Sequence, residues 1–183
     1  MGAYVIILPD KKYINTADLT DFGNIEAEVK TNAPVSFTLC KLDGSEYEVD
    51  HAQTEEPEEP ANGMMWVDTS TVPHTLKQWS ESSGMWVSIA TTYVKIACAN
   101  IGKPFETYDG ITISGLKDKA LHDNVTGDVI EDTTDLAALE GAAVVWDKGD
   151  NYIVVVGVMD ITRTITDQIT ISRNMPHMAI HSI

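Results

Sequence analysis

Cysteine and long apolar runs are scarce in this chain. Cys40 and Cys98 are the only cysteines among 183 residues, and each lies in an apolar, strand-like run where a small buried thiol is the ordinary expectation. A disulfide-stapled secreted domain is therefore not expected, and assembly in a cytoplasm fits better. The most hydrophobic stretch, Tyr152 to Val158, is far shorter than the roughly 20 residues that a membrane-spanning helix needs. We expect no membrane partner.

Positive charge is also scarce. The chain has 12 basic and 28 acidic residues, which gives a formal net charge of −16. Such a surface repels phosphate backbones and anionic lipid head groups unless the charge is reversed locally. The nearest approach to a basic cluster, Lys11 and Lys12, lacks the interleaved aromatic residues of a single-strand binding surface. We expect no nucleic-acid partner.

Catalytic motifs are missing. The sequence has no G-x-S-x-G elbow and no recognised local cysteine signature, so no motif identifies the nucleophile of a hydrolase. Gly141, Gly149 and Gly157 do not follow either phosphate-binding glycine spacing, which argues against a nucleotide cofactor. Paired carboxylates across a cleft would suit a glycan-degrading enzyme, but their abundance alone is no evidence. We therefore predict no enzyme activity and no cofactor.

Metal-binding patterns are weak. His177 and His181 are the only histidines four residues apart, and a complete metal site would need further ligands. The groups Asp123, Asn124 and Asp128, and Asp147, Asp150 and Asn151, carry oxygen ligands suitable for calcium. Neither group follows the EF-hand loop pattern, and turn formation is the favoured role. We expect no metal ion.

Short β-favouring runs dominate what is present. They alternate with turn residues along the whole chain, and 43% hydrophobic content can supply a packed core. The pattern predicts a mainly β fold of short antiparallel sheets and hairpins, sandwich-like or barrel-like, with at most one or two short helices. The expected strands cover 4–8, 35–42, 47–49, 64–69, 75–80, 85–90, 111–113, 142–146, 152–158 and 169–171. The one expected helix covers Asp135 to Glu140, before Gly141.

Turn and linker composition divides the chain into blocks. The blocks are an N-terminal small β region at 1–53, an acidic proline-rich linker at 54–60, a tryptophan-rich meander at 61–97 and a C-terminal β domain at 98–183. Asp43-Gly44 predicts a hairpin over 35–50. A glycine-containing polar link, Lys148 to Asn151, predicts a second hairpin over 142–158.

The tryptophans suggest two alternative roles. Trp66, Trp79 and Trp86, with Tyr93 nearby in sequence, would form a carbohydrate-stacking or partner-binding platform if some rings stay exposed. The simpler alternative is a compact core, because large aromatic side chains are mostly buried. We retain both, with core packing preferred.

A longer pattern supports a family resemblance. The segment from Gly63 to Ser70, followed by Pro73, Leu76-Lys77 and Trp79, has the form G-x-x-W-x-D-T-S-x-x-P-x-x-L-K-x-W. It resembles segments of tail-associated structural proteins of bacteriophages and prophages, of the tail fibre or baseplate type. The runs at 142–146 and 152–157 resemble the N-terminal part of larger phage tail or fibre proteins, so the resemblance covers about two-thirds of the chain.

The resemblance implies a role in the virion, made in the cytoplasm of a bacterial host. It implies a tail protein that assembles with other virion proteins, in several symmetric copies, through sheet edges and apolar patches. The chain departs from the larger proteins by stopping at Ile183, so a receptor-binding region carried downstream in them is not expected here. The alternative function is a carbohydrate-binding or host-adhesion module that contacts a host surface glycan.

Overall fold

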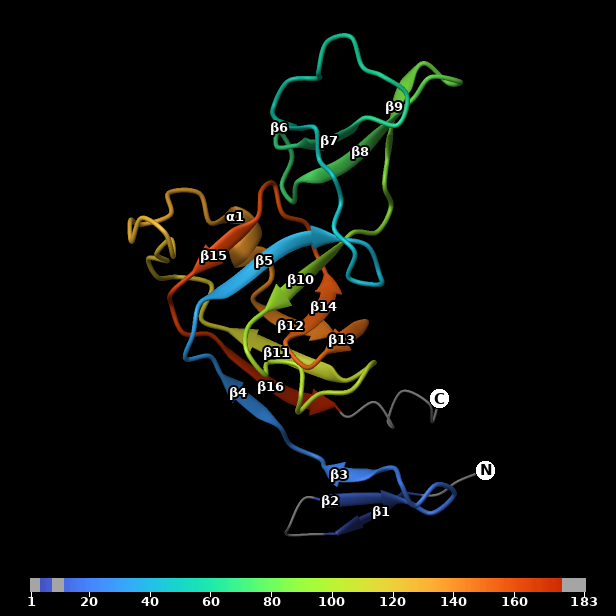
Figure 1. Cartoon of the computed structure of the whole chain (residues 1–183), viewed down its shortest axis with the longest axis vertical. Coiled ribbons are helices and arrows are strands. Elements are labelled where there is room, and N and C mark those ends of the chain that lie inside the picture. The colour runs from blue at the N-terminus through green and yellow to red at the C-terminus, as the bar shows by residue number, and fades with distance from the viewer. Residues whose placement is uncertain (1–3, 8–11, 176–183) are drawn as a thin grey trace.

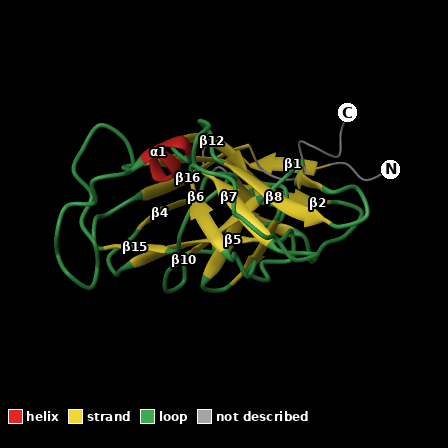
Figure 2. Cartoon of the chain, turned by 90° about the horizontal axis from the view of Figure 1, so that it is seen from above, coloured by secondary structure: helices red, strands yellow, loops and turns green. Residues whose placement is uncertain are grey.

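The computed structural model describes residues 4–7 and 12–175. Within these residues the chain forms sixteen strands and one short helix, α1 (Thr134–Ala138). Figure 2 shows the small helix at one margin of a molecule built otherwise from strands and loops. The predicted mainly β fold of short sheets with one short helix is confirmed.

Two sheets packed face to face form the centre, which we call the sandwich. One sheet has the order β13 (Asp147–Gly149), β14 (Tyr152–Val156), β10 (Tyr93–Ala97), β5 (Val35–Cys40), β15 (Arg163–Ile165). The other has the order β12 (Gly141–Val144), β11 (Gly110–Ser114), β16 (Thr170–Met175), β4 (Glu28–Lys30). Alternate residues point inward, so Phe37 and Ile96 of the first sheet share one fully buried core with Ile111 and Ile171 of the second.

Two smaller sheets lie at the ends of the long axis (Figure 1). The tryptophan sheet has the order β6 (His51–Gln53), β7 (Met65–Asp68), β8 (Thr75–Ser80), β9 (Met85–Ser88), and it joins the common core through Met65, Val67 and Leu76. The N-terminal sheet, at the other end, has the order β1 (Tyr4–Ile7), β2 (Lys12–Asn15), β3 (Phe22–Asn24).

Strand pairing crosses the blocks suggested by composition. The three-stranded meander β7–β8–β9 is confirmed, and β6 adds a parallel strand to it. The acidic segment 54–60 therefore connects two strands of one sheet. β5 of the N-terminal block pairs with β10 of the tryptophan block and with β15 of the C-terminal block. These pairings make the sandwich a product of all three blocks.

The predicted hairpin over 142–158 is wrong in its first arm. β12 pairs with β11, and the hairpin that forms joins β13 to β14. The chain changes sheets at two residues: Val145 N donates to Asp109 O at 3.0 Å, and Trp146 N donates to Val154 O at 2.8 Å. Because Val145 is fully buried, this crossing point is fixed by core packing rather than by turn chemistry.

The predicted hairpin over 35–50 forms only in part. Gly44 has a positive φ of 75°, and Lys41 N donates to Ser45 O at 2.8 Å, so the chain folds back where Asp43-Gly44 predicted. The returning arm pairs only as the single bridge between Cys40 and Glu46, and the strand expected at 47–49 is absent from the described structure. The chain instead turns toward β6.

Candidate functional site

Trp66, Trp79 and Trp86 pack against one another on one face of the tryptophan sheet. Trp79 pairs with Trp86 across β8 and β9, and their ring centroids lie 5.6 Å apart at 66°. Trp66 meets Trp86 at 5.3 Å and 69°, and its Nε1 donates to Gln53 O at 2.9 Å. Such edge-to-face contacts stabilise a pair by about 0.5–1.5 kcal/mol beyond area burial. The three rings hold all four strands together.

The polar residues of the tryptophan motif complete this packing. Lys77 Nζ lies 2.7 Å from Asp68 Oδ2 and 4.6 Å from the ring centroid of Trp66. Ser70 donates to Asp68 Oδ1 through both its backbone N and its hydroxyl. Burial alone would raise the pKa of Asp68, but the hydrogen bonds from Lys77 and Ser70 outweigh it and lower the pKa. Within the described structure, these motif residues stabilise the β7–β8 hairpin.

The predicted platform is not one surface. Trp66 is 3% exposed, so its ring offers no face to a ligand. Trp79 and Trp86 are half-buried and tilted against each other. Tyr93 lies on β10 of the sandwich, in a different sheet. The expectation that these four residues share a binding surface therefore needs correction, because sequence neighbours around Thr91 pass from one sheet to the other.

Tyr93 belongs to a second aromatic group. The ring centroids of Tyr93 and Trp146 lie 6.3 Å apart at an interplanar angle of 69°, and those of Trp146 and Tyr108 lie 6.0 Å apart at 86°. Trp146 is 37% exposed and Tyr108 40% exposed. Tyr108 holds a positive φ of 72°, a conformation that costs a bulky residue about 1–3 kcal/mol. We call Tyr93, Trp146 and Tyr108 the exposed aromatic group.

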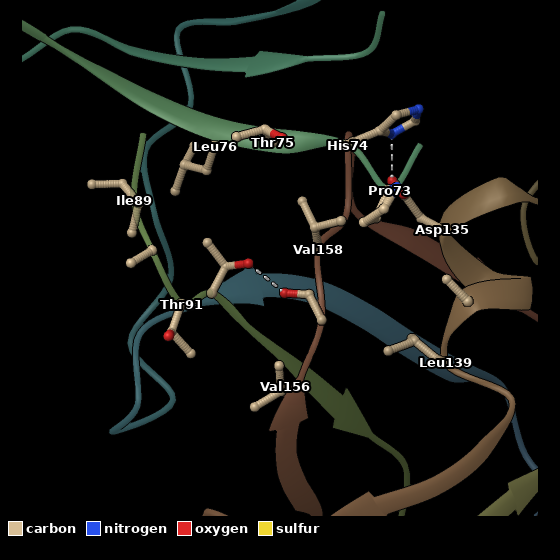
Figure 3. Close-up of a pocket in the computed structure, with 14 residues that line it drawn as sticks. Pro73, His74, Thr75, Leu76, Ile89, Thr91, Asp135, Leu139, Val156 and Val158 are labelled. Carbon is tan, nitrogen blue, oxygen red and sulfur yellow. Dashed lines mark hydrogen bonds and ion pairs between the residues drawn. The ribbon is translucent and has the colours of Figure 1, made fainter. Parts of the chain in front are cut away.

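A cavity of about 460 Å³ lies where β8, α1 and the end of β14 meet (Figure 3). His74 and Asp135 form its polar end: His74 Nδ1 lies 3.0 Å from Asp135 Oδ2, and the two side chains are 6% and 4% exposed. Asp160 N donates to the same oxygen at 2.8 Å. Burial raises the pKa of Asp135, against the opposing effects of Asp160 N and His74.

Metal-ligand candidates in the sequence have other roles or lie outside the described residues. Asp123 Oδ1 accepts hydrogen bonds from Val125 N at 2.7 Å and Thr126 N at 2.9 Å, which is turn formation. His177 and His181 lie outside the described residues. Within residues 4–7 and 12–175, no group of three or more His, Cys, Asp or Glu side chains is placed to hold a metal ion.

The N-terminal sheet carries an apolar edge. Val5, Ile6 and Ile7 on β1 are 47%, 54% and 48% exposed, and Phe22 on β3 is 68% exposed. Successive strand residues point to opposite faces, so three consecutive exposed residues mean that both faces of β1 are uncovered. β1 is also an edge strand of its sheet. An exposed apolar edge strand is a surface on which other chains pair.

Sequence reasoning missed three of these features. The sequence predicted a strand at 4–8 from its apolar run, but it did not predict that this strand is exposed. The pair His74 and Asp135 and the pair Tyr93 and Trp146 are each more than fifty residues apart in sequence, and no motif links them.

Within the described part of the chain, no helix has the length and apolar character needed to span a membrane. Comparisons of the chain with family models, curated proteins and solved structures gave no match.

Proposed function

We propose that this chain is a structural subunit of a bacteriophage tail that joins neighbouring copies of itself through the N-terminal sheet. The observation that carries the proposal is the uncovered apolar edge strand β1. Among the described strands β1 pairs only with β2, so its other edge and its apolar side chains suit strand addition from a second copy. The tryptophan motif and the runs at 142–146 and 152–157, which resemble phage tail proteins, support the tail as the place of assembly.

Charge favours the N-terminal sheet as the contact. Copies that each carry a formal charge of −16 repel one another. β1 (Tyr4–Ile7) contains no charged residue, and the sheet lies at one end of the long axis, beyond the sandwich (Figure 1). Contact through this end keeps the acidic bodies of two copies apart while apolar side chains are removed from water.

Charged residues on β1 should dissociate the assembly. We expect the wild-type chain to have a solution mass that is a multiple of 20.0 kDa. The double substitution Val5→Lys/Ile7→Lys places two like charges at the edge and should shift the mass toward one chain, because lysine on an edge strand opposes strand addition. Light scattering coupled to size-exclusion chromatography measures the mass.

The matched control is Val125→Lys, which adds a charge at a valine that is 87% exposed in a loop. It should leave the mass unchanged. A wild-type chain that stays monomeric over a wide concentration range and does not copurify with tail particles would contradict the proposal.

The exposed aromatic group favours glycan binding as a second candidate function. Trp146 and Tyr108 present rings that are 37% and 40% exposed, and aromatic rings with an apolar face and a polar edge suit sugars. A host surface glycan stacked on Trp146 is the partner that this surface fits. The exposed aromatic group, rather than the tryptophan sheet, is therefore the surface at which we propose that a carbohydrate binds.

Bacterial surface polysaccharides should quench or shift the tryptophan fluorescence through Trp146. The substitution Trp146→Ala removes the exposed ring and should abolish the change. Trp79→Phe, in the tryptophan sheet, should preserve it, because its ring is half-buried against Trp86. A spectrum that responds to no member of a broad glycan panel would eliminate this candidate.

A further inference from the structure

The cavity beside His74 and Asp135 lies outside the surfaces used in the proposed assembly and in the proposed glycan contact. Its walls are largely apolar, with Leu76, Leu139 and Val158 among the lining residues (Figure 3). Its volume of about 460 Å³ lies within the roughly 300–1,000 Å³ typical of small-molecule sites. Val156, which also lines it, is 52% exposed, so the cavity reaches the surface on that side.

One polar atom at the cavity is unsatisfied. Asp135 Oδ2 accepts hydrogen bonds from His74 and from Asp160 N, whereas the buried Oδ1 has no hydrogen-bond partner among the described residues. A buried carboxylate oxygen without a donor is unfavourable, because it has lost its hydration without replacement. Asp135 lines the cavity, so a small rotation of its carboxyl group would let a bound ligand donate a hydrogen bond to this oxygen.

We propose that the cavity binds a small primary amine, with its ammonium group at Asp135 and its apolar stem against Leu139 and Val158. An ammonium donor forms a charge-assisted hydrogen bond, about twice as strong as a neutral one. The formal charge of −16 attracts cations to the protein. The same field and the Asp135 carboxylate disfavour an anionic ligand, and a neutral alcohol offers only the weaker bond.

Three probes with the same stem separate these contributions. Hexylamine, hexanol and hexanoate are titrated into the full chain at neutral pH, and amide and imidazole NMR signals of cavity residues are followed. Hexylamine should bind tightest and hexanoate weakest. Asp135→Asn should weaken hexylamine by at least about tenfold, because it removes the charge at the acceptor, and should change hexanol binding little.

A second variant keeps the test decisive if Asp135→Asn does not fold. Val156→Trp fills the open side of the cavity at a residue that is half exposed, and it should block all three probes. Equal affinity for hexylamine and hexanol, or shifts confined to residues outside the cavity, would overturn the proposal and leave a water-filled cavity. The Val5→Lys/Ile7→Lys chain should bind hexylamine like the wild type, so this outcome is independent of the assembly.

Discussion

Replacing Arg173 by methionine should destabilise the fold by about 3–5 kcal/mol, because it leaves a buried carboxylate without its counterion. Arg173 Nε lies 2.7 Å from Asp109 Oδ2, and the two side chains are 5% and 0% exposed. The other guanidinium nitrogens donate to Asn24 O and Pro104 O, each at 2.6 Å. Arg173 thus ties β16 to the end of β3 and to the loop before β11. Urea unfolding measures the loss.

The double substitution Arg173→Met/Asp109→Asn should recover part of this stability, since the neutral amide removes the unpaired charge. Arg163→Met is the matched control. Its guanidinium lies 3.4 Å from Asp160 Oδ2, and both side chains are partly exposed, at 19% and 17%, so we expect a loss of about 1 kcal/mol or less. Equal losses for the two methionine variants would show that the buried ion pair between Arg173 and Asp109 stabilises the fold no more than an exposed pair does.

The contacts of Arg173 also affect the proposed assembly. Because Arg173 binds the carbonyl of Asn24, the last residue of β3, its loss should loosen the joint between the N-terminal sheet and the sandwich. Amide hydrogen exchange in β2 and β3 should then quicken before the sandwich core unfolds. In the proposed assembly, this joint would set the direction in which β1 is presented to a neighbouring copy.

Local structure was predictable from the sequence. The strand expected at 75–80 is β8 (Thr75–Ser80), and the helix expected at 135–140 overlaps α1 (Thr134–Ala138). Both depend on neighbouring residues: β-favouring side chains bounded by turns, and a short helix-forming run before a glycine. The mainly β class followed from the same local signals.

Pairing between distant segments was not predictable. Nothing in the composition of 142–146 distinguishes a partner at β14 from the observed partner β11. The parallel pairing of β6 with β7 depends on how segment 54–60 crosses the sheet. The candidate sites could not be predicted for the same reason. His74 meets Asp135 across 61 residues of sequence, and a change of sheet separates Tyr93 from Trp66, Trp79 and Trp86.

Replacing Gly102 by alanine should destabilise the chain by about 3 kcal/mol, because the added methyl group has no space. A Cβ at this position would lie 2.0 Å from Gly149 O and 2.4 Å from Tyr152 O. Both are backbone atoms of the β13–β14 hairpin, so no side chain can rotate away to relieve the clash. Gly102 N also donates to Asp150 O at 3.1 Å, which holds the two segments in contact. Thermal and urea unfolding measure the effect.

Gly127→Ala is the control that separates steric clash from backbone strain. A Cβ there meets nothing within 4 Å, but Gly127 has a φ of 74°, so alanine should cost only about 1–2 kcal/mol. The variants should also differ in fluorescence. Trp146 immediately precedes β13 and donates its N to Val154 O, so displacing the hairpin at Gly102 should move the exposed ring, whereas Gly127→Ala should not. An unshifted Trp146 signal in a destabilised Gly102→Ala chain would mean that the hairpin yields elsewhere, and that the exposed aromatic group is held by Tyr93 and Tyr108 rather than by β13.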